Sequence, residues 1–196
     1  MANERIIGDA IPGNCELIEV HISELRQLFN PIDPSPLAER DLDSKAEDFI
    51  LSWARSVRAD ASLALQVFVD REDPGDRPSL AGDAIREFFH QRSLSAHRRL
   101  KQLFRIGRTS LLIGIVALAA AVVVAGIVDR ALSGIAVGAL IRESIVIGGW
   151  VAMWKPLEIF LYDWWPIRAE RKLYDRLSRM PVKIVYQNPR PPAATT

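Results

Sequence analysis

The chain has 196 residues and a nearly balanced charge, with 25 Lys and Arg against 24 Asp and Glu. This length leaves room for one soluble domain of roughly 100 residues and a pair of membrane helices. The net charge of +1 excludes a whole-chain field that attracts nucleic acid. The single cysteine, Cys15, cannot form an intramolecular disulfide, which fits a reducing compartment.

The first 70 residues have the periodicity of a mixed α and β fold. Residues 16–22 and 62–70 alternate between two faces, so we predict a strand in each. Between them, Ser23 is expected to cap a short helix, which the segment NPIDPSP ends because proline removes a backbone donor. Ser44 and Glu47 have the spacing of a capping box, which predicts a second helix from about residue 43 to residue 57.

A long helix leads into the first of two apolar segments. An apolar stripe runs from Ile85 to Leu103, with no clear stop signal before Gly107. From Thr109 to Val128 no side chain is ionisable, and a helix of this length spans ~30 Å, the hydrocarbon thickness of a bilayer. We predict a membrane span over residues 109–128 that continues the preceding helix.

The second apolar segment allows two registers. A span over residues 131–154 contains Arg142 and Glu143, whereas a span over residues 144–165 contains three ionisable residues, Lys155, Glu158 and Asp163. We favour 144–165, because an interfacial aromatic belt then forms from Tyr162, Trp164 and Trp165. Residues 131–141 would then lie along the far membrane surface or form a re-entrant turn.

Basic residues predict the topology. They are dense before residue 109 and after residue 165, and the connecting segment holds only Arg130 and Arg142. The positive-inside bias therefore places both termini in the cytoplasm. The N-terminus lacks the pattern of a cleaved signal peptide, and arginine far outnumbers lysine, as in GC-rich bacterial genomes, so we expect a bacterial inner membrane.

The C-terminal part is expected to return to the soluble domain. Pro166 suits the first turn of a new helix, which would pack along the long helix and pair Asp175 with Arg179. Residues 182–186 alternate, and we expect this third strand to join the first two, since a two-stranded sheet is marginal. Residues 188–196 are expected to form a disordered tail.

Lys155 and Glu158 are the sharpest candidates for function, because ionised residues within a span usually face protein, a cavity or an ionic partner. They could line a proton or solute path. Alternatively, Lys155 extends to the interface and pairs with Glu158, so that both only fix the helix position. We favour this second interpretation. Pro156 between them predicts a kink.

Small residues lie on one stripe of each span and let helix backbones approach closely. These stripes could hold the hairpin together or join two copies. They consist of Gly114, Ala117, Ala121 and Ala125 in the first span and Gly148 with Ala152 in the second.

No complete catalytic, metal or nucleotide motif is present in the sequence. His90 and His97 lie ~10 Å apart along one helix, too far to bind one ion. The segment DREDPGD lacks the glutamate that closes a calcium loop, since Ala81 occupies that position. We therefore expect no cofactor, no metal and no enzymatic activity.

The segment from Gly148 to Ile184 and the upstream LRQLFNPIDPSPLAERDLD resemble small two-span inner-membrane proteins of bacteria. The resemblance implies a hairpin joined to a soluble domain, and transfers no catalytic residue or substrate.

We thus predict an α+β protein. Residues 1–108 form a cytoplasmic domain with a juxtamembrane helix, residues 109–165 a two-helix transmembrane hairpin, and residues 166–187 a helix and strand that pack on the first domain. The expected function is that of a membrane-anchored adaptor or accessory subunit with a protein partner or a second copy. The alternative is an oligomeric ion-conducting or proton-conducting component that uses Lys155 and Glu158.

Overall fold

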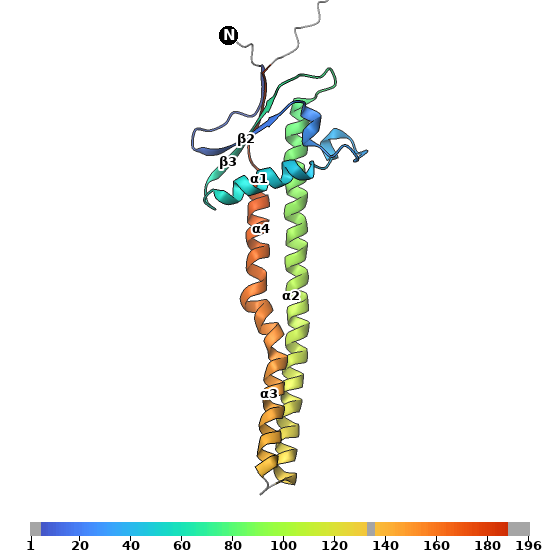
Figure 1. Ribbon diagram of the computed structural model, residues 1–196, viewed down its shortest axis with the longest axis vertical. Coiled ribbons are helices and arrows are strands. Elements are labelled where there is room, and N and C mark those ends of the chain that lie inside the picture. Colours follow the sequence, from blue (N-terminus) through green and yellow to red (C-terminus); the bar gives the residue numbers. More distant parts are fainter. Residues whose placement is uncertain (1–4, 133–135, 188–196) are drawn as a thin grey trace, which may run out of the picture. The chain divides into compact units, whose positions relative to one another are not determined.

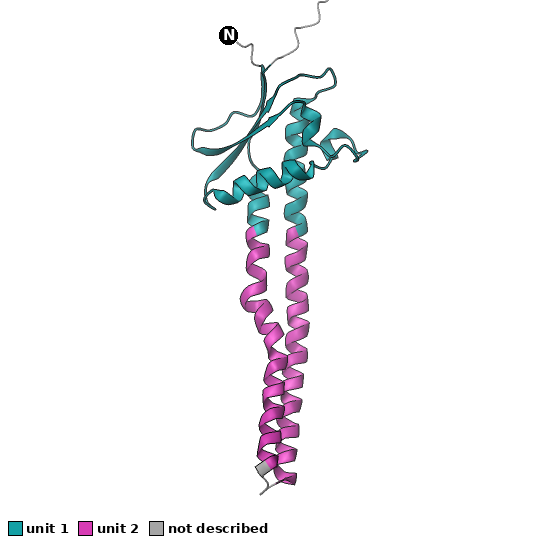
Figure 2. Ribbon diagram, in the orientation of Figure 1, with its two compact units in different colours: residues 1–95, 170–196 teal, residues 96–169 magenta. Residues whose placement is uncertain are grey.

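The computed structural model describes residues 5–132 and 136–187 (Figure 1). The chain divides into two compact units, one of residues 1–95 with 170–196 and one of residues 96–169 (Figure 2). The expected tail of residues 188–196 lies outside the described residues.

The first unit contains a four-stranded sheet in the order β1-β4-β3-β2. Its strands are β1 (Arg5–Gly8), β2 (Cys15–Ile22), β3 (Ser62–Val69) and β4 (Val182–Tyr186). β2, β3 and β4 are parallel to one another, and β1 is antiparallel to β4. The prediction that the C-terminal strand joins the two earlier strands is confirmed, and β4 pairs with β3.

The prediction of three strands was incomplete, because β1 forms the edge beside β4. Its four residues are too short for an alternation to be recognised, and the strand exists only through pairing with β4 from the other end of the chain. Gly8 ends β1 with a φ of 115°, and an added Cβ there would overlap the carbonyl oxygen of Val182. Only glycine fits this backbone without strain.

Helices cover one face of the sheet and bury its apolar side chains. They are α1 (Ser44–Ser56), the first part of α2 (Pro78–Ala131) and the last part of α4 (Trp164–Leu177), with a 3-10 helix at Leu25–Leu28. A second 3-10 helix, Leu37–Glu39, has no buried residue. α2 lies close to β4 at Gly82, where an added Cβ would be in ordinary van der Waals contact with Val182 Cβ at 3.7 Å. Leu65, Ile85 and Leu177 are fully buried in this core. Phe89 of α2 packs against Tyr174 of α4 with 6.4 Å between ring centroids.

Two predicted helix caps were wrong. The N-cap of α1 is Asp43, whose carboxylate accepts a hydrogen bond from the Lys45 N–H at 2.9 Å. Glu47, predicted to close the capping box, instead forms an ion pair with Arg92 of α2. Ser23 does not cap the short helix that follows it, which is a 3-10 turn preceded by Glu24.

The second unit consists of helical segments. α2 continues without interruption to Ala131, as predicted, and is followed by α3 (Ala136–Glu158), a π-helical turn (Ile159–Asp163) and the start of α4. The helical stretches Pro78–Ala131 and Val137–Leu177 are long and apolar enough to cross a membrane. Residues 136–141 belong to α3, so the expected surface segment or re-entrant turn is not seen in the described part of residues 131–141. Pro166 lies in the first turn of α4, as predicted, and α4 begins two residues earlier at Trp164, directly after the π turn.

Candidate functional site

Glycines bring α2 and α3 into close contact within the second unit. A Cβ added to Gly114 of α2 would lie 2.9 Å from the Met153 sulfur, and one added to Gly149 of α3 would lie 2.8 Å from Ala121 Cβ. At Gly107 an added Cβ would lie 2.9 Å from Ile159 Cγ2. Later residues of α2 meet earlier residues of α3, so the two helices are antiparallel neighbours.

The stripe proposed for the first span faces this contact. Gly114 and Ala125 are buried there, and Ala117 and Ala121 are half-buried. The pair proposed for the second span does not pack against α2 in the same way. Gly148 is exposed, with nothing within 4 Å of an added Cβ, and the Ala152 side chain is exposed. The contact with α2 that was predicted for Gly148 is instead made by Gly149, which lies against Ala121 and Leu118.

An ion pair between Asp129 and Arg142 marks the far end of the paired helices, with 3.8 Å between Oδ1 and Nε. At the other end of the paired helices, Gly107 of α2 lies against Ile159, which is four residues after Lys155. At 1.5 Å per residue, Lys155 is therefore about 6 Å from the level of Gly107 and Arg108, just before the predicted span. Both residues that pair with Lys155 lie farther along the chain in that direction.

Lys155, Glu158 and Asp163 are brought together by the structure. The ammonium of Lys155 lies 3.1 Å from Glu158 Oε2 and 3.9 Å from Asp163 Oδ2. Helical side chains lean toward the N-terminus of their helix, yet this ammonium reaches toward the C-terminal side. That direction leads to the level of Arg108, as expected for a lysine that extends from a span to its interface. The Lys155 side chain is 65% exposed, so it does not line an enclosed path within one chain.

The aromatic residues of the proposed belt follow this cluster. Tyr162 and Trp165 are exposed, and Trp164 is half-buried. The Trp164 indole N–H donates a hydrogen bond to the Phe160 carbonyl at 2.9 Å, within the π turn. The Arg168 guanidinium lies 5.4 Å from the Trp164 ring. A basic and aromatic girdle of this kind is typical of a membrane interface.

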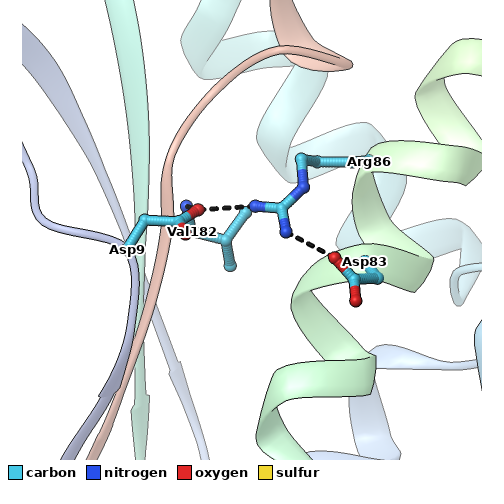
Figure 3. Close-up of polar contacts among 4 residues, drawn as sticks. All are labelled: Asp9, Asp83, Arg86 and Val182. Atoms are coloured by element: carbon cyan, nitrogen blue, oxygen red, sulfur yellow. Dashed lines mark hydrogen bonds and ion pairs between the residues drawn. The ribbon is translucent and has the colours of Figure 1, made fainter.

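In the first unit, Arg86 of α2 links the helix to the sheet (Figure 3). Its guanidinium donates to Asp9 Oδ2 at 2.5 Å and to Asp83 Oδ1 at 2.6 Å. Burial alone would lower the pKa of Arg86, but the hydrogen bonds and charges of Asp83 and Asp9 raise it. Asp9 also accepts a hydrogen bond from the Val182 N–H at 3.1 Å, and its own N–H donates to the Val182 carbonyl. This network fixes the end of β1 and contains no unpaired catalytic group.

An open hollow of about 450 Å³ adjoins this network. Its charged side chains are already engaged: Arg86 as described, and Arg179 with the Asp175 carboxylate at 2.6 and 2.7 Å. The predicted Asp175–Arg179 pair is thus confirmed. In the part of the chain that the structure describes, no group of three or more His, Cys, Asp or Glu side chains could hold a metal ion.

Two features of these sites escaped sequence reasoning. The sequence carried a signal for Gly149, because Gly148 and Gly149 are adjacent and only the helix phase separates them. It carried none for the Asp9–Arg86 link, whose partners are 77 residues apart. Comparison of the chain with protein-family models, curated proteins and solved structures gives no match.

Proposed function

We propose that this protein is a membrane-anchored interaction protein, an adaptor or accessory subunit of a membrane complex. In this proposal the α+β unit lies at the cytoplasmic face of a bacterial inner membrane, and α2 and α3 form a two-span hairpin. The observation that carries it is the pair of closely packed apolar helices whose outward side chains are large, apolar and exposed. These include Leu112, Ile113, Val116, Ile147, Val151 and Trp154.

Such a surface is unfavourable in water, because contiguous apolar patches beyond a few hundred Å² mark interaction or membrane sites. A bilayer solvates it. The Lys155 cluster supports the same placement, since its charges point toward the end of the span rich in basic and aromatic residues. Positive-inside bias then assigns that end to the cytoplasm.

The topology is tested by cysteine labelling in a Cys15→Ser background. In intact cells, an impermeant maleimide should label Asp129→Cys, at the far end of the hairpin. It should label Glu170→Cys, in the first unit, only after lysis. A reporter fused after Thr196 should be cytoplasmic, and an extracytoplasmic reporter would overturn the hairpin.

The interaction role is tested by purification in several gentle detergents after cross-linking in the membrane. We expect a stable complex with a protein partner or with a second copy. Recovery of the monomer alone under all these conditions would contradict this role.

The second candidate function is ion or proton conduction by an oligomer. It is favoured by one observation: Lys155, Glu158 and Asp163 form a charged group that is partly exposed on the outside of apolar helices. Two spans alone enclose no pathway, so several copies would have to place these charges in a shared interior. Vesicles with the native protein should then leak ions faster than vesicles with a Lys155→Leu, Glu158→Gln variant, and equal rates would exclude conduction.

A further inference from the structure

We infer that the open face of the four-stranded sheet is a contact between two copies of this chain. The opposite face is covered by α1, α2 and α4. Parallel sheets are normally covered on both faces, whereas no helix among residues 5–132 and 136–187 covers this face of the parallel β2-β3-β4 sheet. This inference rests on the proposed interaction role and names the partner as a second copy.

The side chains of this face are defined by the strand register. One row consists of Glu19, Gln66 and Lys183, and the next consists of His21, Phe68, Val185 and Ile6. Glu19 and His21 are exposed, and Gln66, Phe68 and Lys183 are half-buried. Ile6 is 56% exposed, although it is a large apolar residue in the middle of a strand. The small Ala64 and Val185 are buried among their larger neighbours.

The apolar row is already ordered for a contact. The rings of His21 and Phe68 are stacked, with 4.6 Å between centroids and a tilt of 7°. This stack is a flat surface next to Val185, which is buried, and Ile6 lies beyond Val185 on the edge strand. Aromatic rings are large contact surfaces, and they are enriched at interfaces.

The charged row selects the partner. Strands are ~4.8 Å apart, so Glu19 on β2 and Lys183 on β4 flank Gln66 on β3 at equal distances. They do not pair with each other, and neither has an ion-pair partner among the described residues. The face therefore presents separated opposite charges about a central amide.

This arrangement is complementary to itself. A twofold axis that runs along β3 exchanges β2 with β4, which places Glu19 of each copy opposite Lys183 of the other. Gln66 then faces Gln66, and Phe68 faces Phe68. A twofold axis across the strands would instead oppose like charges, so the charges choose the first arrangement.

Charge exchange provides the main test. Dimerisation of the full chain is measured in lipid vesicles by energy transfer between labelled copies, because confinement to one membrane raises the effective concentration. Glu19→Lys or Lys183→Glu alone replaces two attractive pairs by two repulsive ones and should weaken the dimer about tenfold. The double variant Glu19→Lys, Lys183→Glu restores both pairs and should bind like the native chain.

A cross-link tests the position of the axis. In a Cys15→Ser background, Gln66→Cys should join two copies through a short bifunctional maleimide. A disulfide is not expected, because packed sheets are ~10 Å apart and a disulfide needs Cα atoms within about 7 Å. The control is Ser52→Cys on the exposed side of α1, which should not cross-link.

Three results would overturn the inference. A monomer in vesicles would do so, and a dimer that is insensitive to the charge exchanges would place the contact elsewhere. If the Gln66→Cys variant were a monomer whose introduced thiol is protected from a monofunctional maleimide, the chain would cover this face itself. All three would leave the topology from cysteine labelling unchanged, so this inference can fail while membrane anchoring holds.

Discussion

Adjacent glycines in α3 allow a matched test of how the two apolar helices pack. A Cβ added to Gly149 would lie 2.8 Å from Ala121 Cβ and 3.1 Å from Leu118 Cδ1, whereas one added to Gly148 would meet nothing within 4 Å. Gly149→Ala should therefore force the helices apart. Gly148→Ala should not.

The expected magnitude follows from two opposing terms. Replacing glycine by alanine in a helix stabilises it by about 0.5–1 kcal/mol, and this gain is common to both variants. Overpacking at Gly149 costs about 1–3 kcal/mol. The difference between the variants is therefore the packing term, which corresponds to a melting-temperature difference of about 2–12 °C in a chain of this size.

The assay is thermal unfolding in a mild detergent, followed by far-UV circular dichroism. Hydrogen exchange of peptides from α3 then shows whether the change lies in the helix contact. Gly148→Ala should be as stable as the native chain or more stable, and Gly149→Ala less stable with faster exchange. Equal melting temperatures and exchange rates for the two variants would refute the packing of Gly149 against α2.

Three further predictions concern the first unit. Asp9→Ala removes contacts to both α2 and β4 and should lower the free energy of unfolding, measured by urea titration, by about 1–3 kcal/mol. The Asp83 side chain is more exposed, so Asp83→Ala should lower it by less than about 1 kcal/mol. Gly8→Ala should cost about 1–3 kcal/mol because of its φ of 115°, and Gly13→Ala, with open space around it, should be nearly neutral by the same measurement. Backbone N–H groups of residues 41 and 35 lower the pKa of Asp33 to about 2, so its contribution to stability is present above about pH 4 and is lost as the pH falls toward 2. Asp33→Asn should remove this part of the pH dependence of stability. An NMR titration of the native Asp33 carboxyl with a midpoint near 4 would contradict the prediction.

Local patterns predicted much of the fold. Alternation located β2, β3 and β4, and helical spacing located α1 and the long helix, because each pattern records which side of an element is buried. The absence of charge from Thr109 to Val128 required no tertiary information. The cap of α1 was misassigned because Asp43 and Ser44 are both good capping residues and only the backbone geometry distinguishes them.

The candidate sites depended more on tertiary structure. The sequence identified Lys155 and Glu158 as unusual, since charge within an apolar helix is visible without coordinates. It could not show that the Lys155 ammonium extends toward Asp163, because that direction depends on a side-chain conformation. Nor could it choose between Gly148 and Gly149, since a rotation of one residue, ~100°, moves a side chain from the contact to the outside.

The sequence by itself therefore determined most of the elements of this protein and the two segments apolar enough to cross a membrane, because these depend on local periodicity and hydropathy. Only the tertiary structure decided the fourth strand, the helix contact and the composition of the open sheet face. These features need partners from distant parts of the chain: Asp9 and Val182, which hold β1 in place, are 173 residues apart. Pairing at such a separation leaves no periodic signal in either segment alone.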